Sequence, residues 1–277
     1  MTFYRRIRTG LALAVLCAGT ASGAGPSYSA AGIVNASSFT AGPFAPGSVI
    51  AIFGTDLARS QHELTQDDLV PCKSSLPGWC LPLELNYVRV YVQDQPVPLL
   101  FVSAGQINFL MPTNGIPGPV TVRVATQGIT GQDLSGPYAI VTLVPAAPAL
   151  FPNPIAAGYV IAQDRDYHLL TADNPAHAGD IVVLYLTGLG MTSPNPVPGE
   201  IPTYAAQMFA SNLVTLQVTL NGTAVDPTLI KYAGLTPYSA GLYQINLYVP
   251  DWAGTDPAIE VFAGTVGSQT GLKLPVQ

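Results

Sequence analysis

Two short stretches decide the fold of this chain: AGQINFLMP at residues 104–112 and AGLYQINLYVP at residues 240–250. Both contain Gln-Ile-Asn, and both reach a proline four residues after the asparagine. Apolar and polar residues alternate through each copy, which is the period of a β-strand with one buried face. Proline cannot donate to a strand ladder, so it ends a strand or lies at an edge. We therefore predict that each stretch is one strand of a sheet.

The repeated motif consists of Gln106, Ile107 and Asn108 in the first copy and Gln244, Ile245 and Asn246 in the second. We predict that both isoleucines face a core and that the amide side chains face the other way. Amides beside turns mostly bond to backbone, so we expect them to bond to the preceding glycine-containing turn and fix the strand register. A ligand-binding role for the four amides is the alternative.

Two further blocks recur in the same order along the chain. PGSVIAIFGTDLA at 46–58 matches AGDIVVLYLTGLG at 178–190, and VRVYVQDQPV at 88–97 matches LQVTLNGTAV at 216–225. This self-similarity indicates two related units of roughly 120 residues, close to the size of one β-sandwich domain. Asn221-Gly222 is a strong hairpin-turn signal within the second unit.

The sequence therefore predicts an all-β protein with two tandem immunoglobulin-like β-sandwich domains. We place a signal peptide at 1–24, the first domain at 31–145, a proline-rich linker at 146–152 and the second domain at 153–277. Four prolines in PAAPALFPNP indicate that this linker is stiff and extended.

The N-terminus has the features of a secretory signal peptide. Arg5, Arg6 and Arg8 precede an apolar run at 11–18, and small residues follow it up to Ala24. We expect export to the periplasm, the cell surface or the medium, with no transmembrane anchor in the mature chain, since the later apolar stretches are broken by prolines. Cys72 and Cys80 then remain in PCKSSLPGWC, and a close pair in an oxidising compartment predicts a disulfide.

Composition excludes several classes of function. Charged residues make up 9% of the 277 residues, the formal net charge is −6, and no basic block follows the N-terminus, so we expect no nucleic-acid partner. The histidines, His62, His168 and His177, lie in no motif of a hydrolase or a metalloenzyme. The acidic stretch at 163–180 fits a polar hairpin better than a calcium loop. We expect no catalytic residue, no metal and no cofactor.

Four loop aromatics are the possible ligand-binding residues: Trp79, Trp252, Tyr204 and Tyr238. Exposed aromatics on sandwich loops suit contact with sugars or proteins. The alternative is that they fill the ends of the two cores.

Several of these blocks resemble a known family. GIVNASSFTAGPFAPGSVIAIFGTDLA, LLFVSAGQINFLMP, NPAHAGDIVVLYLTGLG and GLYQINLYVP are similar to the uncharacterised Solibacter-type C-terminal domain of secreted acidobacterial proteins, over about residues 31–277. The first unit is also similar to IPT/TIG immunoglobulin-like domains. The resemblance implies export and an immunoglobulin-like fold, and it implies no activity.

The sequence thus predicts a secreted, non-catalytic interaction or structural module that binds an unknown protein or glycan at a cell surface. A carbohydrate-binding module and a hydrolase are the alternatives.

Overall fold

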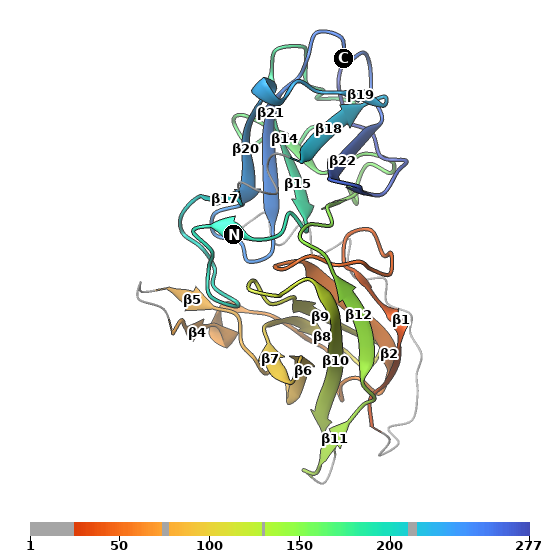
Figure 1. Ribbon diagram of the computed structural model, residues 1–277, viewed down its shortest axis with the longest axis vertical. Helices are drawn as coiled ribbons and strands as arrows, with labels where there is room; N and C mark the ends of the chain where they lie inside the picture. The colour runs from red at the N-terminus through yellow and green to blue at the C-terminus, as the bar shows by residue number, and fades with distance from the viewer. Residues whose placement is uncertain (1–24, 74–77, 129–130, 210–214) are drawn as a thin grey trace.

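A computed structural model describes residues 25–73, 78–128, 131–209 and 215–277. The signal peptide predicted at 1–24 lies outside the described residues. Two β-sandwich units follow one another along the long axis of the molecule (Figure 1). The predicted fold class, all-β with two immunoglobulin-like sandwiches, is confirmed. Among the described residues no helix has the length and apolarity to cross a membrane.

The first unit packs two antiparallel sheets face to face. The first sheet has the order β1-β2-β9-β8-β3, with β1 at Ser27–Asn35, β2 at Val49–Thr55, β9 at Gln106–Leu110, β8 at Leu99–Val102 and β3 at His62–Glu63. The second has the order β11-β10-β6-β7, with β11 at Asp133–Ser135, β10 at Gly118–Gln127, β6 at Val88–Val92, β7 at Gln95–Val97, and β12 (Ala139–Leu143) also paired with β10.

The second unit also contains two antiparallel sheets. One sheet has the order β13-β15-β21-β20-β17-β16, with β13 at Ala149–Leu150, β15 at Ile181–Thr187, β21 at Tyr243–Tyr248, β20 at Ile230–Leu235, β17 at Ala206–Met208, β16 at Thr192–Ser193, and β14 (Ala162–Asp164) paired with β15. The other has the order β19-β18-β22-β23, with β19 at Thr223–Ala224, β18 at Leu216–Leu220, β22 at Ile259–Ala263 and β23 at Val266–Gly267. Short 3-10 turns lie at Gln66–Asp68 and Pro227–Leu229.

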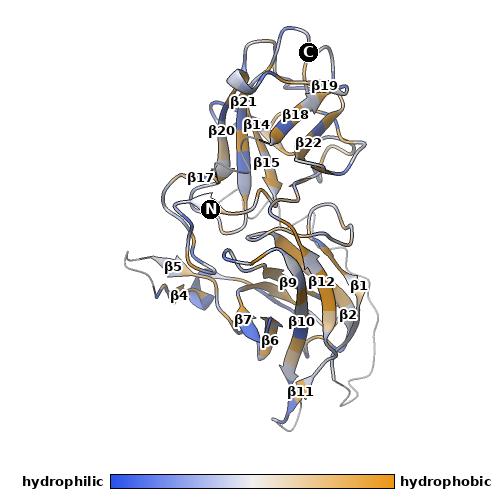
Figure 2. Ribbon diagram, viewed as in Figure 1, coloured by the Kyte–Doolittle hydropathy of each residue, from blue (hydrophilic) through white to orange (hydrophobic). Residues whose placement is uncertain are grey.

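Strand alternation builds a separate core in each unit. In β10, every second residue from Val120 onward is buried, and the residues between them remain partly exposed. Ile107 of β9 and Ile245 of β21 are both fully buried, each in the core of its own unit. Figure 2 shows the same interleaving of apolar and hydrophilic residues along the strands. The hairpin signal at Asn221-Gly222 lies at the β18–β19 turn, where both residues have positive φ, as this turn type requires.

Two local expectations differ from the structure. The stretch expected to be a linker, 146–152, is folded into the second unit, because β13 within it pairs with β15 and its side chains at 149–151 are buried. The amides of the repeated motif bond to each other rather than to a turn. Nε2 of Gln106 donates to Oδ1 of Asn108, and Nε2 of Gln244 donates to Oδ1 of Asn246, each at 2.9 Å. Residues two apart on a strand share a face, so this pairing satisfies both amides locally.

Candidate functional site

Cys72 and Cys80 form the predicted disulfide, with their Cα atoms 5.1 Å apart. The bond closes a ribbon made of β4 (Val70–Pro71) and β5 (Trp79–Cys80), which projects from the first unit beside the loops of the second (Figure 1). The ribbon does not belong to the first unit alone. The amide of Ile201 donates to the carbonyl of Trp79 at 2.9 Å, and the amide of Leu81 donates to the carbonyl of Gly199 at 2.8 Å.

A segment of the second unit therefore pairs with the edge of β5 through an isolated antiparallel bridge. We call residues 195–204 the strap. Glu200 of the strap forms an antiparallel bridge with Cys80 of β5. At its start, the amide nitrogen Nδ2 of Asn195 donates to the carbonyl of Thr113, and Oγ1 of Thr113 donates to the carbonyl of Pro196. The strap is thus hydrogen-bonded to the first unit along most of its length.

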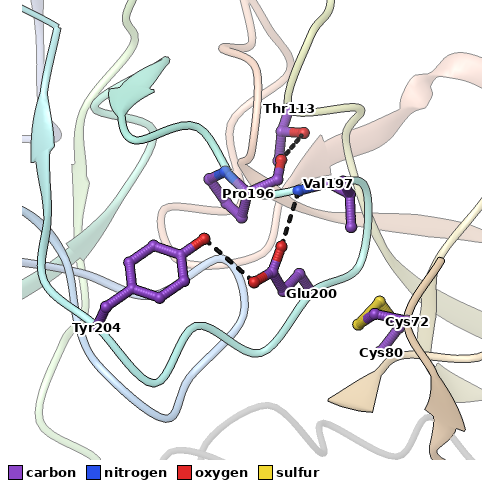
Figure 3. Close-up of a disulfide and its surroundings, with 7 residues drawn as sticks. All are labelled: Cys72, Cys80, Thr113, Pro196, Val197, Glu200 and Tyr204. Atoms are coloured by element: carbon purple, nitrogen blue, oxygen red, sulfur yellow. Dashed lines mark hydrogen bonds between the residues drawn. A yellow bond between two sulfur atoms is a disulfide. The ribbon is translucent and has the colours of Figure 1, made fainter. Parts of the chain in front are cut away.

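A buried carboxylate fixes the shape of the strap. Glu200 accepts the amide N–H of Val197 at 3.0 Å and the hydroxyl of Tyr204 at 3.1 Å (Figure 3). Burial, with the Glu200 carboxylate adding to it, raises the pKa of Tyr204 to about 12. The Tyr204 hydroxyl therefore stays protonated and donates to Glu200 throughout the ordinary pH range.

Buried contacts continue the junction behind the strap. Thr187, at the end of β15, is fully buried; its hydroxyl donates to the carbonyl of Gly241 at 3.0 Å and accepts the amide of Val49 at 3.1 Å. The Tyr243 hydroxyl donates to the carbonyl of Gly190 at 2.7 Å and lies 3.4 Å from the carbonyl of Pro46. An apolar cluster also joins the two units; its fully buried members are Leu64, Leu81, Leu110 and Ala240. These contacts hold the two sandwiches together as one body.

Three of the four aromatics predicted as ligand-binding residues are attached to the strap. The backbone carbonyl of Trp79 accepts the amide of Ile201, and the backbone amide of Tyr238 donates to the carbonyl of Pro202. The hydroxyl of Tyr204 donates to the carboxylate of Glu200. The side chain of Trp79 is 57% exposed and that of Tyr238 is 70% exposed. We call these three residues the junction surface.

The other predicted site residues lie elsewhere. Trp252 is 47% exposed, but it follows the end of β21 that points away from the first unit. The amides of Gln106 and Asn108 are buried and bond to each other. Sequence reasoning singled out Tyr204 but missed Thr187, Glu200 and the pairing of the strap with the first unit. The one available signal was the high proline content of residues 194–202. It predicts extended backbone there, but it does not identify the segment with which that backbone pairs.

Each of the three histidines contacts an aspartate that is near it in the sequence. His62 lies 3.0 Å from Asp68, His168 lies 3.0 Å from Asp164, and His177 lies 3.6 Å from Asp180. The two members of each pair are close in the sequence, at most six residues apart. In the part of the chain that the structure describes, no three His, Cys, Asp or Glu side chains gather as a metal site would require.

Tyr243 allows a test of the junction by pH. Its burial raises the pKa of the phenol above the ordinary value of about 10. The folded state thus keeps a proton that the unfolded chain loses, so this contribution to stability is complete below about pH 10 and is lost as pH rises further. We expect Tyr243→Phe to cost about 1 kcal/mol at neutral pH through the lost hydrogen bond. The variant should also show a shallower fall in stability above pH 10. Urea unfolding between pH 7 and 11 measures both.

Tyr87→Phe is the matched control, because Tyr87 is 58% exposed; it should change stability at neutral pH by less than about 0.5 kcal/mol. An alkaline slope in Tyr243→Phe equal to that of the wild type would contradict the assignment.

No family model and no curated protein matches the chain. Among solved structures it is similar to SGBP-B of the Bacteroides ovatus mixed-linkage glucan utilization locus, solved with a mixed-linkage heptasaccharide, at 13% identity over 84% of this chain and 42% of that one, with a TM-score of 0.30. It is also similar to the Ig1-2 module of the Drosophila receptor protein tyrosine phosphatase DLAR, at 14% identity over 92% and 95% of the two chains, with a TM-score of 0.21.

A third similar structure is that of the fibronectin(III)-like modules of Clostridium thermocellum CbhA, at 10% identity over 92% and 90% of the two chains, with a TM-score of 0.20. The chain spans less than half of the Bacteroides protein. At these identities and TM-scores none of the three assigns a function to it.

Proposed function

We propose that this chain is an exported, non-catalytic binding module that holds a protein partner of the cell surface against the junction surface. One observation carries the proposal: Trp79 and Tyr238 are exposed on backbone that is hydrogen-bonded to successive residues of the strap, Ile201 and Pro202. Tryptophan and tyrosine are the residues that most often dominate the binding energy of protein interfaces. Backbone held in place before binding reduces the entropy that association costs.

The remaining features of the chain agree with this proposal. A disulfide between Cys72 and Cys80 suits an oxidising compartment, and the sequence at 1–24 has the pattern of an export signal. The non-catalytic part is tested directly by assays of activity. Turnover of chromogenic ester, phosphate or glycoside substrates by the purified protein would contradict that part.

The variant Trp79→Ala/Tyr238→Ala tests the surface. If each residue contributes about 2 kcal/mol, the pair should weaken binding by about a thousandfold, since 1.4 kcal/mol is tenfold. The purified protein is cross-linked to the cell envelope of the producing organism, the linked protein is identified by mass spectrometry, and its affinity is then measured with purified components. Trp252→Ala is the matched control and should bind as the wild type does. Binding that survives in the double variant and is lost in Trp252→Ala would overturn the proposal.

A further inference from the structure

A second surface lies on the outer face of the sheet β11-β10-β6-β7, towards the end of the first unit that is far from the strap (Figure 1). The valines at even positions of β10 fill the core, so the odd positions face outward. Cross-strand pairing places Arg89 opposite Ala125 and Ala125 opposite Ser135. The small side chains of Ala125 and Ser135 form the floor of a hollow of about 130 Å³, which we call the sheet groove.

Long polar and aromatic side chains form the walls of the sheet groove. Tyr91 and Arg123 stand side by side on one flank, and Tyr87 and Asp133 belong to the other. Tyr87 is 58% exposed. Its positive φ of 62° places it in a turn just before β6, and its carbonyl accepts the amide of Gln127 on β10. The groove thus presents to solvent an aromatic side chain, carried on hydrogen-bonded backbone, beside polar groups.

Arg123 is held rigidly at the centre of this face. Its guanidinium lies 4.4 Å from the ring centre of Tyr91 and 5.4 Å from that of Tyr138, so it contacts both rings. Nη1 donates to the hydroxyl of Ser135 at 2.8 Å. The Tyr138 hydroxyl donates to Asp94, which lies 3.8 Å from Nη2 of Arg123. A guanidinium has five N–H donors. The one on Nε of Arg123 is buried without a partner, so the N–H groups left for a ligand are those on Nη1 and Nη2 that do not contact Ser135 or Asp94.

The carboxylates around the groove outnumber the basic side chains by one, which restricts the ligand. Arg89 forms an ion pair with Glu84, Arg123 faces Asp94, and the carboxylate of Asp133 lines the groove as well. Two positive charges therefore stand against three negative ones, and an anionic ligand gains nothing here. Hydroxyl groups of a sugar both donate and accept hydrogen bonds, so they match arginine donors and carboxylate acceptors together. The apolar C–H face of a sugar ring stacks on an aromatic side chain.

We propose that the sheet groove binds a neutral oligosaccharide. Tyr87 supplies the stacking face, Arg89 and Arg123 donate to ring hydroxyls, and Asp133 accepts from them. The site shares no residue with the junction surface, so it does not depend on the function proposed there. It would give one chain two contacts with a cell surface, one with protein and one with glycan.

Native gel electrophoresis in soluble polysaccharides tests this proposal. Neutral glucans, mannans, xylans and galactans are cast separately into gels, with polygalacturonate as the anionic comparison. We expect at least one neutral polysaccharide to retard the wild-type chain and polygalacturonate to leave its mobility unchanged. Tyr87→Ala and Arg89→Ala should each weaken the retardation at least tenfold, read as the polysaccharide concentration that gives half of the mobility shift. Tyr167→Ala is the matched control, because Tyr167 is also exposed and has a φ of 66°.

Circular dichroism and thermal melting of each variant establish that it is folded, and both substitutions lie on the surface, so one folded variant is enough to decide. Retardation by none of the neutral polysaccharides would overturn the proposal, as would retardation that persists unchanged in both groove variants. Loss of retardation in Trp79→Ala/Tyr238→Ala alone would move glycan binding to the junction surface. Binding of a polyproline peptide that both groove variants abolish, without retardation by any glycan, would make the groove a peptide site.

Discussion

Ile245→Ala in β21 is expected to destabilise the protein by about 2–5 kcal/mol, the range for removing a buried isoleucine side chain and leaving a cavity. The residue is fully buried in the core of the second unit. Both neighbouring strands, β15 and β20, pair with β21 directly at Ile245, so the surrounding backbone has little freedom to close the cavity. Ile107→Ala in β9 is the equivalent change in the first unit and should have an effect of the same size.

Urea unfolding measured by circular dichroism gives both values. Ile155→Ala in the second unit and Ile140→Ala in the first are matched controls, since both side chains are largely exposed; each should change stability by less than about 0.5 kcal/mol. A loss below 1 kcal/mol for either buried isoleucine would show that its strand does not form the core as described.

Gly188→Ala should be among the most damaging single substitutions at the junction. Gly188 follows β15 with a φ of 86°, and a Cβ atom there would overlap the carbonyl oxygen of Ala147. The same two residues are already in contact, because the amide of Ala147 donates to the carbonyl of Gly188 at 2.8 Å. Left-handed backbone costs about 1–2 kcal/mol and overpacking a further 1–3 kcal/mol or so, so we expect a total of about 2–5 kcal/mol.

Gly179→Ala separates the two contributions. Gly179 precedes β15 with nearly the same φ, 85°, but a Cβ atom there has nothing within 4 Å. It should therefore cost only the backbone strain of about 1–2 kcal/mol. The difference between the two variants in denaturant unfolding measures the steric conflict with Ala147. Equal losses in both would mean that the close approach at Gly188 is absent in solution.

The strands and the disulfide could be predicted because their signals are local. Alternation of side chains across a strand places Ile107 and Ile245 on one face without any knowledge of the partner strands. Cys72 and Cys80 are close in the sequence, so pairing needs no long-range information. The stretch at 146–152 was ambiguous, since prolines favour extended backbone and extended backbone suits a linker as well as the edge strand β13.

The strap and the sheet groove could not be predicted, because both depend on which distant segments pair. Trp79 and Ile201 pair across a long stretch of chain, and one sequence holds no record of which distant segments meet. Arg89, Tyr91 and Arg123 occupy outward positions of two strands, which is the ordinary pattern of a solvated sheet face. Only the pairing of β10 with β6 on one side and with β11 on the other places them around the small floor residues Ala125 and Ser135.

The strap also affects the order in which parts of the chain can complete their folding. During synthesis the N-terminal part emerges first. At that stage β5 can pair with β4, but the edge that later bonds to Gly199 and Ile201 remains open. An unpaired strand edge is a template for association with other chains. The first sandwich therefore keeps this edge open until the second unit has emerged as far as Ile201, and the disulfide between Cys72 and Cys80 joins β4 to β5 during that interval.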